Sequence, residues 1–306
     1  MTPFFRLLWR EVRQGLPTTA ASVVAVLAWY TFLASRIGRW NEGLVLAMSQ
    51  MPLWWLPLGA LWHTYQSFKN DLDTSRAYLL LSLPVYGWQL AGAKLLAVWL
   101  GTALYVGATF GGIAAMVQGV GVPGLPPDMS AAVGAQFART LVGAVGILLA
   151  ILLAFALPAW LVLVQAAWGA GRTVPRGRHV LMGLAFLAGG WLLLRVAVVG
   201  AAVLDFLPTV PAFPYPDLYR APGGIWTVAT RWLAMHPGPW LAVVLATAVG
   251  FVGTARAVER ALDAEGARWP AVAGVAIVAA AAAADLYLNG AGLFDALLQA
   301  LIGAGT

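Results

Sequence analysis

Side chains able to do chemistry are most concentrated in residues 68–84. Lys69, Asp71, Asp73 and Arg76 occur there, between long apolar segments. Charged groups are costly in hydrocarbon, so these four side chains must remain in contact with water. The segment is therefore expected to be a connection between two membrane spans, and we place it on the cytoplasmic side.

A short helix is predicted inside this connection, over residues 76–82. A hydroxyl at residue 74 or 75 can cap its amino terminus, and Pro84 ends it or opens the next helix. A short helix carrying charges and leucines across the membrane face is typical of a docking element. An ordinary loop with a surface helix is the alternative.

Polar groups within the apolar spans are the second kind of candidate. Arg195 falls near the middle of a span, where it could bind an anionic substrate or lipid head group. The alternative is a structural role, with a carboxylate or backbone carbonyls elsewhere in the bundle as its partner. Asp205 lies about 15 Å further along the same helix, which makes it a poor direct partner.

The second span is unusually rich in aromatic residues. Trp54 and Trp55 could line a hydrophobic substrate path, although aromatic packing explains them as well. His63 follows Trp62 and is either a hydrogen-bonded core residue or a functional group. We carry Arg195, Trp54, Trp55 and His63 forward as candidates for a substrate path.

Motifs of known enzyme classes are missing from the sequence. It contains no G-x-x-x-x-G-K-[ST] phosphate loop, no H-E-x-x-H and no G-x-S-x-G. Because there are no cysteines, disulfides and thiolate metal sites are excluded. We therefore expect neither an enzyme nor a resident cofactor or metal, although a dispersed active site would leave no motif.

The composition is that of a membrane protein. The chain is 61% hydrophobic and only 10% charged, with a mean hydropathy of +0.81, whereas soluble domains carry about 25% charged residues. Apolar runs of about 20 residues recur along the whole chain. They predict an all-α polytopic membrane domain over residues 1–306, with six or seven spans at 18–33, 44–67, 88–118, 139–168, 180–207, 240–255 and 270–288.

Three further segments complete the predicted architecture. Residues 2–16 form an amphipathic helix at the membrane interface, with Arg6 on its wet face; a signal peptide is the alternative. Residues 208–239 form an outer loop whose apolar piece, 224–235, is a helix on or in the interface. Residues 270–306 supply an extra carboxyl-terminal span and tail.

The distribution of basic residues sets the orientation. With the amino terminus in the cytoplasm, twelve lysine and arginine residues fall in inner segments and five in outer ones, as the positive-inside rule requires. The net charge of +6 therefore reflects topology, and no nucleic-acid partner is expected. We predict a multi-pass protein of the cell membrane.

Two motifs resemble a known family. The amphipathic start, residues 5–11, is similar to the elbow helix of permease subunits in the type 2 ATP-binding-cassette (ABC) transporter family. Residues 68–84, with Leu-Leu-Ser-Leu-Pro at 80–84, and the following Gly-Ala-Lys at 92–94 resemble that family's loop between spans two and three. The resemblance covers residues 3–265. The segment from Pro270 onward departs from it, because six spans with both ends inside are the family norm.

The resemblance implies a function. A permease subunit dimerises, as a homo- or heterodimer, forms the substrate path and is driven by a separate nucleotide-binding subunit that holds ATP and magnesium. Membrane lipid would surround the permease subunit as a further partner. The coupling surface it implies consists of Asp71, Leu72, Asp73, Thr74, Arg76, Leu80 and Leu81.

Three other classes remain open. They are an ion-gradient-driven secondary transporter, a non-catalytic membrane assembly subunit and a membrane enzyme. A secondary transporter would favour paired acidic or polar groups at mid-membrane, whereas here only Arg195 is central. The apolar, aromatic spans favour an amphiphilic or hydrophobic cargo for an exporter.

Overall fold

The computed structural model describes residues 3–72, 86–126, 128–172, 177–260 and 268–302. Its helices are α1 (Pro3–Ala34), α2 (Glu42–Ser49), α3 (Met51–Leu72), α5 (Gly87–Val120), α6 (Ala131–Ile151), α7 (Leu157–Arg172), α8 (Arg178–Val203), α9 (Pro237–Arg260) and α10 (Arg268–Ile302), with a π-helical turn, η1 (Leu152–Ala156), joining α6 to α7. The strands are β1 (Val210–Arg220) and β2 (Trp226–Met235).

The prediction of an all-α polytopic membrane protein is confirmed. Within the described residues, six helical segments are long and apolar enough to cross a membrane: Pro3–Ala34, Glu42–Lys69, Gly87–Val120, Ala131–Arg172, Arg178–Val203 and Pro237–Ala257. They correspond to the first six predicted spans. Within the predicted seventh span and tail, residues 268–302 form one continuous helix, α10, which includes the apolar stretch Ala273–Asn289.

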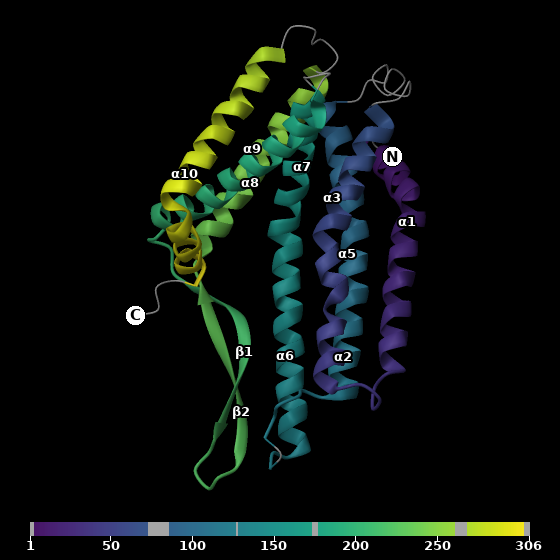
Figure 1. Ribbon diagram of the computed structural model, residues 1–306, viewed down its shortest axis with the longest axis vertical. Coiled ribbons are helices and arrows are strands. Elements are labelled where there is room, and N and C mark those ends of the chain that lie inside the picture. Colours follow the sequence, from purple (N-terminus) through teal and green to yellow (C-terminus); the bar gives the residue numbers. More distant parts are fainter. Residues whose placement is uncertain (1–2, 73–85, 127, 173–176, 261–267, 303–306) are drawn as a thin grey trace.

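The helices form two groups, which meet where α7 packs on α3 and α9 packs on α5. Helices α1 and α3 both pack on α5, and α8 packs on α7, α9 and α10. In Figure 1 the amino terminus of α1, the end of α3 and the start of α5 lie at one end of the molecule, and the β-hairpin extends from the other. We call these the amino-terminal end and the hairpin end.

Helix α1 differs from the prediction. Residues 2–16 were expected to form a separate interfacial helix, but from Pro3 the chain is helical without a break to Ala34, through Pro17. Pro17 and Arg13 are both exposed, so the one intrahelical hydrogen bond that proline removes is lost on the outer face.

The most extensive contact between two described helices is that of α1 with α5. A cluster of buried side chains joins them near the hairpin end, including Val26, Tyr30 and Ile113. A Cβ atom on Gly112 would overlap the Tyr30 ring. Glycine therefore permits the approach of the two helices, as small residues do in membrane bundles.

Proline interrupts the second span, and side chains from α1 repair the break. Because Pro52 has no N–H, the Met48 carbonyl has no donor four residues on. The indole of Trp29 donates to it at 3.2 Å. The hydroxyl of Tyr30 donates at 2.7 Å to the next carbonyl, that of Ser49, so the break between α2 and α3 has the internal hydrogen bonds that a membrane requires.

A similar repair stabilises the π-helical turn. The amide of Leu157 bonds to the Leu152 carbonyl, in the i to i+5 pattern. By that pattern the Leu153 carbonyl would need the N–H of residue 158, which is proline. The Trp99 indole of α5 donates to it instead, at 2.9 Å.

The hairpin corrects a second prediction. The piece 224–235 was expected to be a helix, but Trp226–Met235 is strand β2, paired antiparallel with β1. The sequence of β2 is rich in β-branched and aromatic residues, which favour strands. In β1, Pro214 and Pro216 are two apart, so their nitrogens face the same edge, where no ladder bond is required.

Asp128 attaches the hairpin to the connection between α5 and α6. Its carboxylate accepts hydrogen bonds from the Trp226 indole at 2.9 Å and from the Arg220 guanidinium at 2.5 Å. The guanidinium also lies over the Trp226 ring, 5.0 Å from its centroid. These contacts tie the predicted outer loop, 208–239, to the bundle.

Candidate functional site

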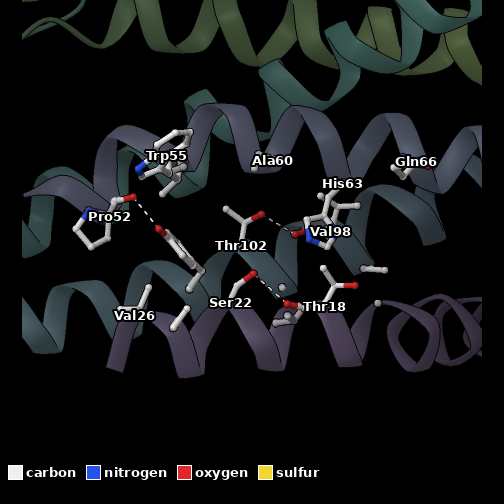
Figure 2. Close-up of a pocket in the computed structure, with 18 of the residues that line it drawn as sticks. Thr18, Ser22, Val26, Pro52, Trp55, Ala60, His63, Gln66, Val98 and Thr102 are labelled. Atoms are coloured by element: carbon white, nitrogen blue, oxygen red, sulfur yellow. Dashed lines mark hydrogen bonds between the residues drawn. The ribbon is translucent and has the colours of Figure 1, made fainter. Parts of the chain in front are cut away.

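A cavity of about 630 Å³ lies between α1, α3 and α5. Helices α1 and α3 both contact α5 but scarcely touch one another, which leaves a space with α5 as its floor. Figure 2 shows side chains from all three helices pointing into this space. A volume of this size is within the range of about 300–1,000 Å³ found for small-molecule sites.

The lining of the cavity is polar at the amino-terminal end and apolar at the hairpin end. The polar part carries amide, hydroxyl, imidazole and carboxylate groups: Glu11, Gln14, Thr18, Thr19 and Ser22 of α1 with His63, Gln66 and Ser67 of α3. The apolar part is built from Ala25, Val26 and Trp29 of α1 with Met51, Pro52, Trp55 and Leu56 of α3.

Both walls change character at the same level because α1 and α3 run in opposite directions. In Figure 2, Thr18, His63 and Gln66 lie toward one side of the view, and Val26, Pro52 and Trp55 toward the other. The lining of the cavity therefore changes from polar to apolar along its length, as an amphiphilic molecule does.

A buried ion pair closes the polar end. The Lys94 ammonium of α5 bonds to Glu11 Oε2 of α1 at 3.1 Å and to the Ser67 carbonyl of α3 at 2.8 Å. Arg10 donates to the other carboxylate oxygen of Glu11 at 2.7 Å. The Lys94 and Glu11 side chains are only 1% and 5% exposed. This cluster, which we call the three-helix ion pair, joins α1, α3 and α5 at one point.

The other end of the cavity is closed by the proline break. The Tyr105 hydroxyl of α5 donates to the Pro52 carbonyl at 2.8 Å, a bond drawn in Figure 2. Trp29, whose indole bonds to the Met48 carbonyl, lies beside it in the lining. The aromatic side chains thus hold the α2–α3 break against both α1 and α5.

The predicted substrate-path residues separate in the structure. Trp55 and His63 line the cavity. Trp54 lies outside it and is 78% exposed on the outer surface of α3.

Arg195 is far from this lining and is paired. Its guanidinium forms an ion pair with Asp285 of α10, and its Nε atom donates to Asp285 Oδ2 at 2.6 Å. Trp191 and Asn289 also donate to this carboxylate, at 2.7 and 3.0 Å. Arg195 thus has the carboxylate partner that was the structural alternative, contributed by a helix about 90 residues further along the chain.

Most of the predicted coupling surface lies outside the described residues. Asp71 and Leu72 fall in the last turn of α3, where only the backbone is described, while Asp73, Thr74, Arg76, Leu80 and Leu81 lie outside the described residues. Residues 68–72 of the predicted connection continue helix α3, and Lys94 ties that end of α3 to α5 through the Ser67 carbonyl.

Sequence reasoning missed the three-helix ion pair. Lys94 was assigned to the orienting basic residues, and residues 2–16 were expected to form an interfacial helix in which Glu11 had no assigned partner; in the structure Leu7 and Glu11 are both buried. One signal was present: Glu11 is the only acidic residue of α1, and a lysine inside an apolar helix needs a carboxylate partner.

The comparisons with known proteins identify no relatives. No family model, curated protein or solved structure matches the chain. Among the described residues no group of three or more histidine, aspartate or glutamate side chains could hold a metal ion. The class established by the fold is a polytopic helical membrane protein with a cavity between its first three spans.

Proposed function

We propose that the chain is the membrane-spanning permease subunit of an ABC exporter in the cell membrane. Its amino terminus is cytoplasmic, it pairs with a second permease subunit, and residues 68–84 dock on a separate ATPase subunit. Movement of that segment, driven by ATP in the partner, shifts the spans and opens the path for cargo.

One observation carries this proposal most strongly. The connection 68–84 lies between α3 and α5, and Lys94 ties the end of α3 to the start of α5 through the Ser67 carbonyl and to α1 through Glu11. A push on the connection would be passed to three helices together, because the bonds that join them are buried and charge-assisted. The same three helices form the walls of the cavity.

Co-purification provides the first test. The full chain, tagged, expressed in its own host cells and extracted in mild detergent, should co-purify with an ATPase subunit. In vesicles that contain both proteins, ATP should drive transport. Transport by the purified chain alone on an ion gradient would contradict the proposal and favour a secondary transporter. Recovery of a complex with neither activity would favour an assembly subunit.

Charge reversal tests the coupling segment. Asp73→Arg combined with Arg76→Asp should leave insertion and ATP hydrolysis intact but reduce transport to background, because the charges set the register of docking. The control reverses the exposed hairpin pair, Asp217→Arg with Arg231→Asp, whose oxygen and nitrogen lie 2.7 Å apart. Normal transport in the first double variant would contradict the assignment of this surface.

A further inference from the structure

We propose that the cavity between α1, α3 and α5 binds a single-chain amphiphile with an uncharged, hydroxyl-bearing head group. The inference rests on the proposed function, in that it names the chemical class of the cargo. Its geometric basis is independent of that function, because it depends only on the lining of the cavity.

The direction of the ligand follows from the two halves of the lining. Gln14, Thr18 and Ser22 recur every four residues on α1 and form one polar stripe, opposite His63 and Gln66 of α3. A head group placed there can form hydrogen bonds with polar side chains of both walls. The tail then extends toward Val26, Trp29, Trp55 and Leu56, where burial of apolar surface is favourable.

The charge of the head group follows from the ion pair. Among the lining residues Glu11 is the only carboxylate, and no lysine or arginine lines the cavity. Both oxygens of Glu11 already accept charge-assisted hydrogen bonds, from Arg10 and from Lys94. A charged head group would lose its hydration without gaining an opposite charge, a cost that an uncharged head group avoids.

The hydroxyl preference follows from the directions of the internal hydrogen bonds. Ser22 donates its hydroxyl to the Thr18 carbonyl, and Thr102 donates to the Val98 carbonyl, both at 2.9 Å. Figure 2 shows both bonds on the cavity wall. Each hydroxyl has used its one proton, so toward the cavity it offers lone pairs that accept. The complementary ligand group is an O–H donor.

The volume favours a single chain. About 630 Å³ suits one drug-sized molecule. The floor of the cavity is also narrow, because at Gly101 a Cβ would lie 2.8 Å from the Thr19 hydroxyl. Single-chain monoacylglycerols have the required volume and head-group chemistry, so we choose one as the probe.

The experiment uses the full chain in phosphatidylcholine nanodiscs. The probe is 1-decanoylglycerol with a photoreactive diazirine at the end of its chain, and labelled peptides are mapped by mass spectrometry. We expect labelling around residues 25–29 and 51–56. Unlabelled 1-decanoylglycerol should compete at least about tenfold better than decanoate or decyltrimethylammonium. A tenfold difference in affinity corresponds to about 1.4 kcal/mol of binding free energy.

Two glycine variants test whether the cavity is the site. Gly59 lies in the middle of the α3 lining, and a Cβ there meets nothing within 4 Å, so Gly59→Leu adds a side chain to the cavity wall with no contact at its Cβ. It should weaken binding about tenfold or more. The matched control is Gly107→Leu on α5, where a Cβ also meets nothing within 4 Å but the residue does not line the cavity.

A second pair tests the head group. Thr18→Val removes a hydroxyl from the polar stripe with little change in volume, and should weaken binding of the glycerol probe about two- to tenfold, the loss of one hydrogen bond. Thr31→Val is the control, because Thr31 lies on the same helix outside the lining. Thr31→Val should change binding of neither ligand, and Thr18→Val should weaken competition by decanol, which lacks the glycerol head, less than competition by 1-decanoylglycerol.

The outcomes separate this inference from the proposed function. Equal labelling of the Gly59→Leu and Gly107→Leu proteins, or equal competition by the charged analogues, would overturn the inference even if an ATPase subunit co-purifies. Site-specific labelling with no ATPase partner would support the binding site and overturn the proposed function alone.

Discussion

At the scale of single residues, the buried Glu11–Lys94 ion pair has the strictest requirement for partners. Two charges are buried with exposures of 5% and 1%, and their hydration is replaced by Arg10, by the Ser67 carbonyl and by each other. Removing one partner from such a pair leaves the other charge buried and uncompensated. The stability of the bundle should therefore depend on both residues being present.

Single replacements should be strongly destabilising. Glu11→Gln and Lys94→Met should each lower the free energy of unfolding by about 3–5 kcal/mol, and the double variant by less than the sum of the two. The measurement is unfolding by SDS titration in mixed micelles. Asp217→Asn is the control, because its partner Arg231 is 64% exposed and surface pairs contribute about 1 kcal/mol or less. Additive losses would contradict a coupled pair.

Asp128 should make the hairpin attachment sensitive to acid. The hydrogen bonds from Trp226 and from Arg220 lower the pKa of this carboxyl below its ordinary value of 3.8. Because the folded pKa lies below the unfolded one, the stabilisation is fully present above pH 3.8 and is lost as the pH falls through the folded value.

The variant Asp128→Asn checks this dependence. The difference in unfolding temperature between the natural chain and the variant should be constant from pH 7 to about pH 5 and should shrink below pH 3.8, as the natural carboxylate gains its proton. A difference that grew on acidification would show that the carboxylate does not anchor the hairpin in its ionised form.

At the scale of elements, two helix irregularities rely on aromatic side chains of neighbouring helices. The α2–α3 break is satisfied by Trp29 and Tyr30, and the π-helical turn by Trp99. For the Met48 and Leu153 carbonyls, a proline four or five residues further on removes the backbone donor. Hydrocarbon offers no water as a substitute, so the donor must come from a side chain.

Replacing Trp99 should expose this dependence. Trp99→Phe keeps the ring but removes the indole N–H, which leaves the Leu153 carbonyl without a donor and should cost about 1–3 kcal/mol. Pro158→Ala restores the backbone N–H of residue 158. In the Pro158→Ala protein, Trp99→Phe should therefore cost less. Unfolding in mixed micelles measures both effects, with Trp54→Phe, at a position 78% exposed, as the control. An equal cost in both backgrounds would contradict the explanation.

Helix α10 is held through an internal ion pair instead of by an extended apolar face alone. Asp285 accepts from Arg195, Trp191 and Asn289. The carboxylate would be costly in the bundle without these donors, and the guanidinium would be costly without the carboxylate. Helix α10 is therefore joined chemically to α8.

At the scale of the whole molecule, its two ends are chemically different. The ion pair and the basic residues of α1 lie at the amino-terminal end, and the hairpin with its Asp128 attachment lies at the hairpin end. The cavity repeats this difference, from polar to apolar. A molecule with such opposed ends should have one orientation in the membrane.

Cysteine labelling tests the orientation directly, because the natural chain contains no cysteine. Thr74→Cys, in the proposed coupling segment, should react with an impermeant maleimide only after the cells are opened. Thr230→Cys, exposed on β2, should react in intact cells. Labelling of position 74 from outside would contradict the cytoplasmic assignment of residues 68–84 and, with it, the docking of an ATPase there.

Composition and periodicity were sufficient for the class of fold. Runs of apolar residues locate the first six spans because the bilayer imposes both their length and their lack of charge. The same signal did not distinguish strand from interfacial helix over residues 226–235, since a ten-residue apolar piece fits either structure. The pattern also did not show that α1 continues unbroken through Pro17. That result depends on the surroundings of the Arg13 carbonyl, which loses its hydrogen bond to the amide of residue 17.

The site was only partly visible in the sequence. Trp55 and His63 were singled out by residue type alone, whereas the pairing of Glu11 with Lys94 and of Arg195 with Asp285 spans 83 and 90 residues. Sequence patterns report what a segment needs: a span must be apolar, and a buried charge must have a partner. Which partner it finds, and where two helices part to leave a cavity, depends on the packing of segments far apart in the chain, and only the tertiary structure decides it.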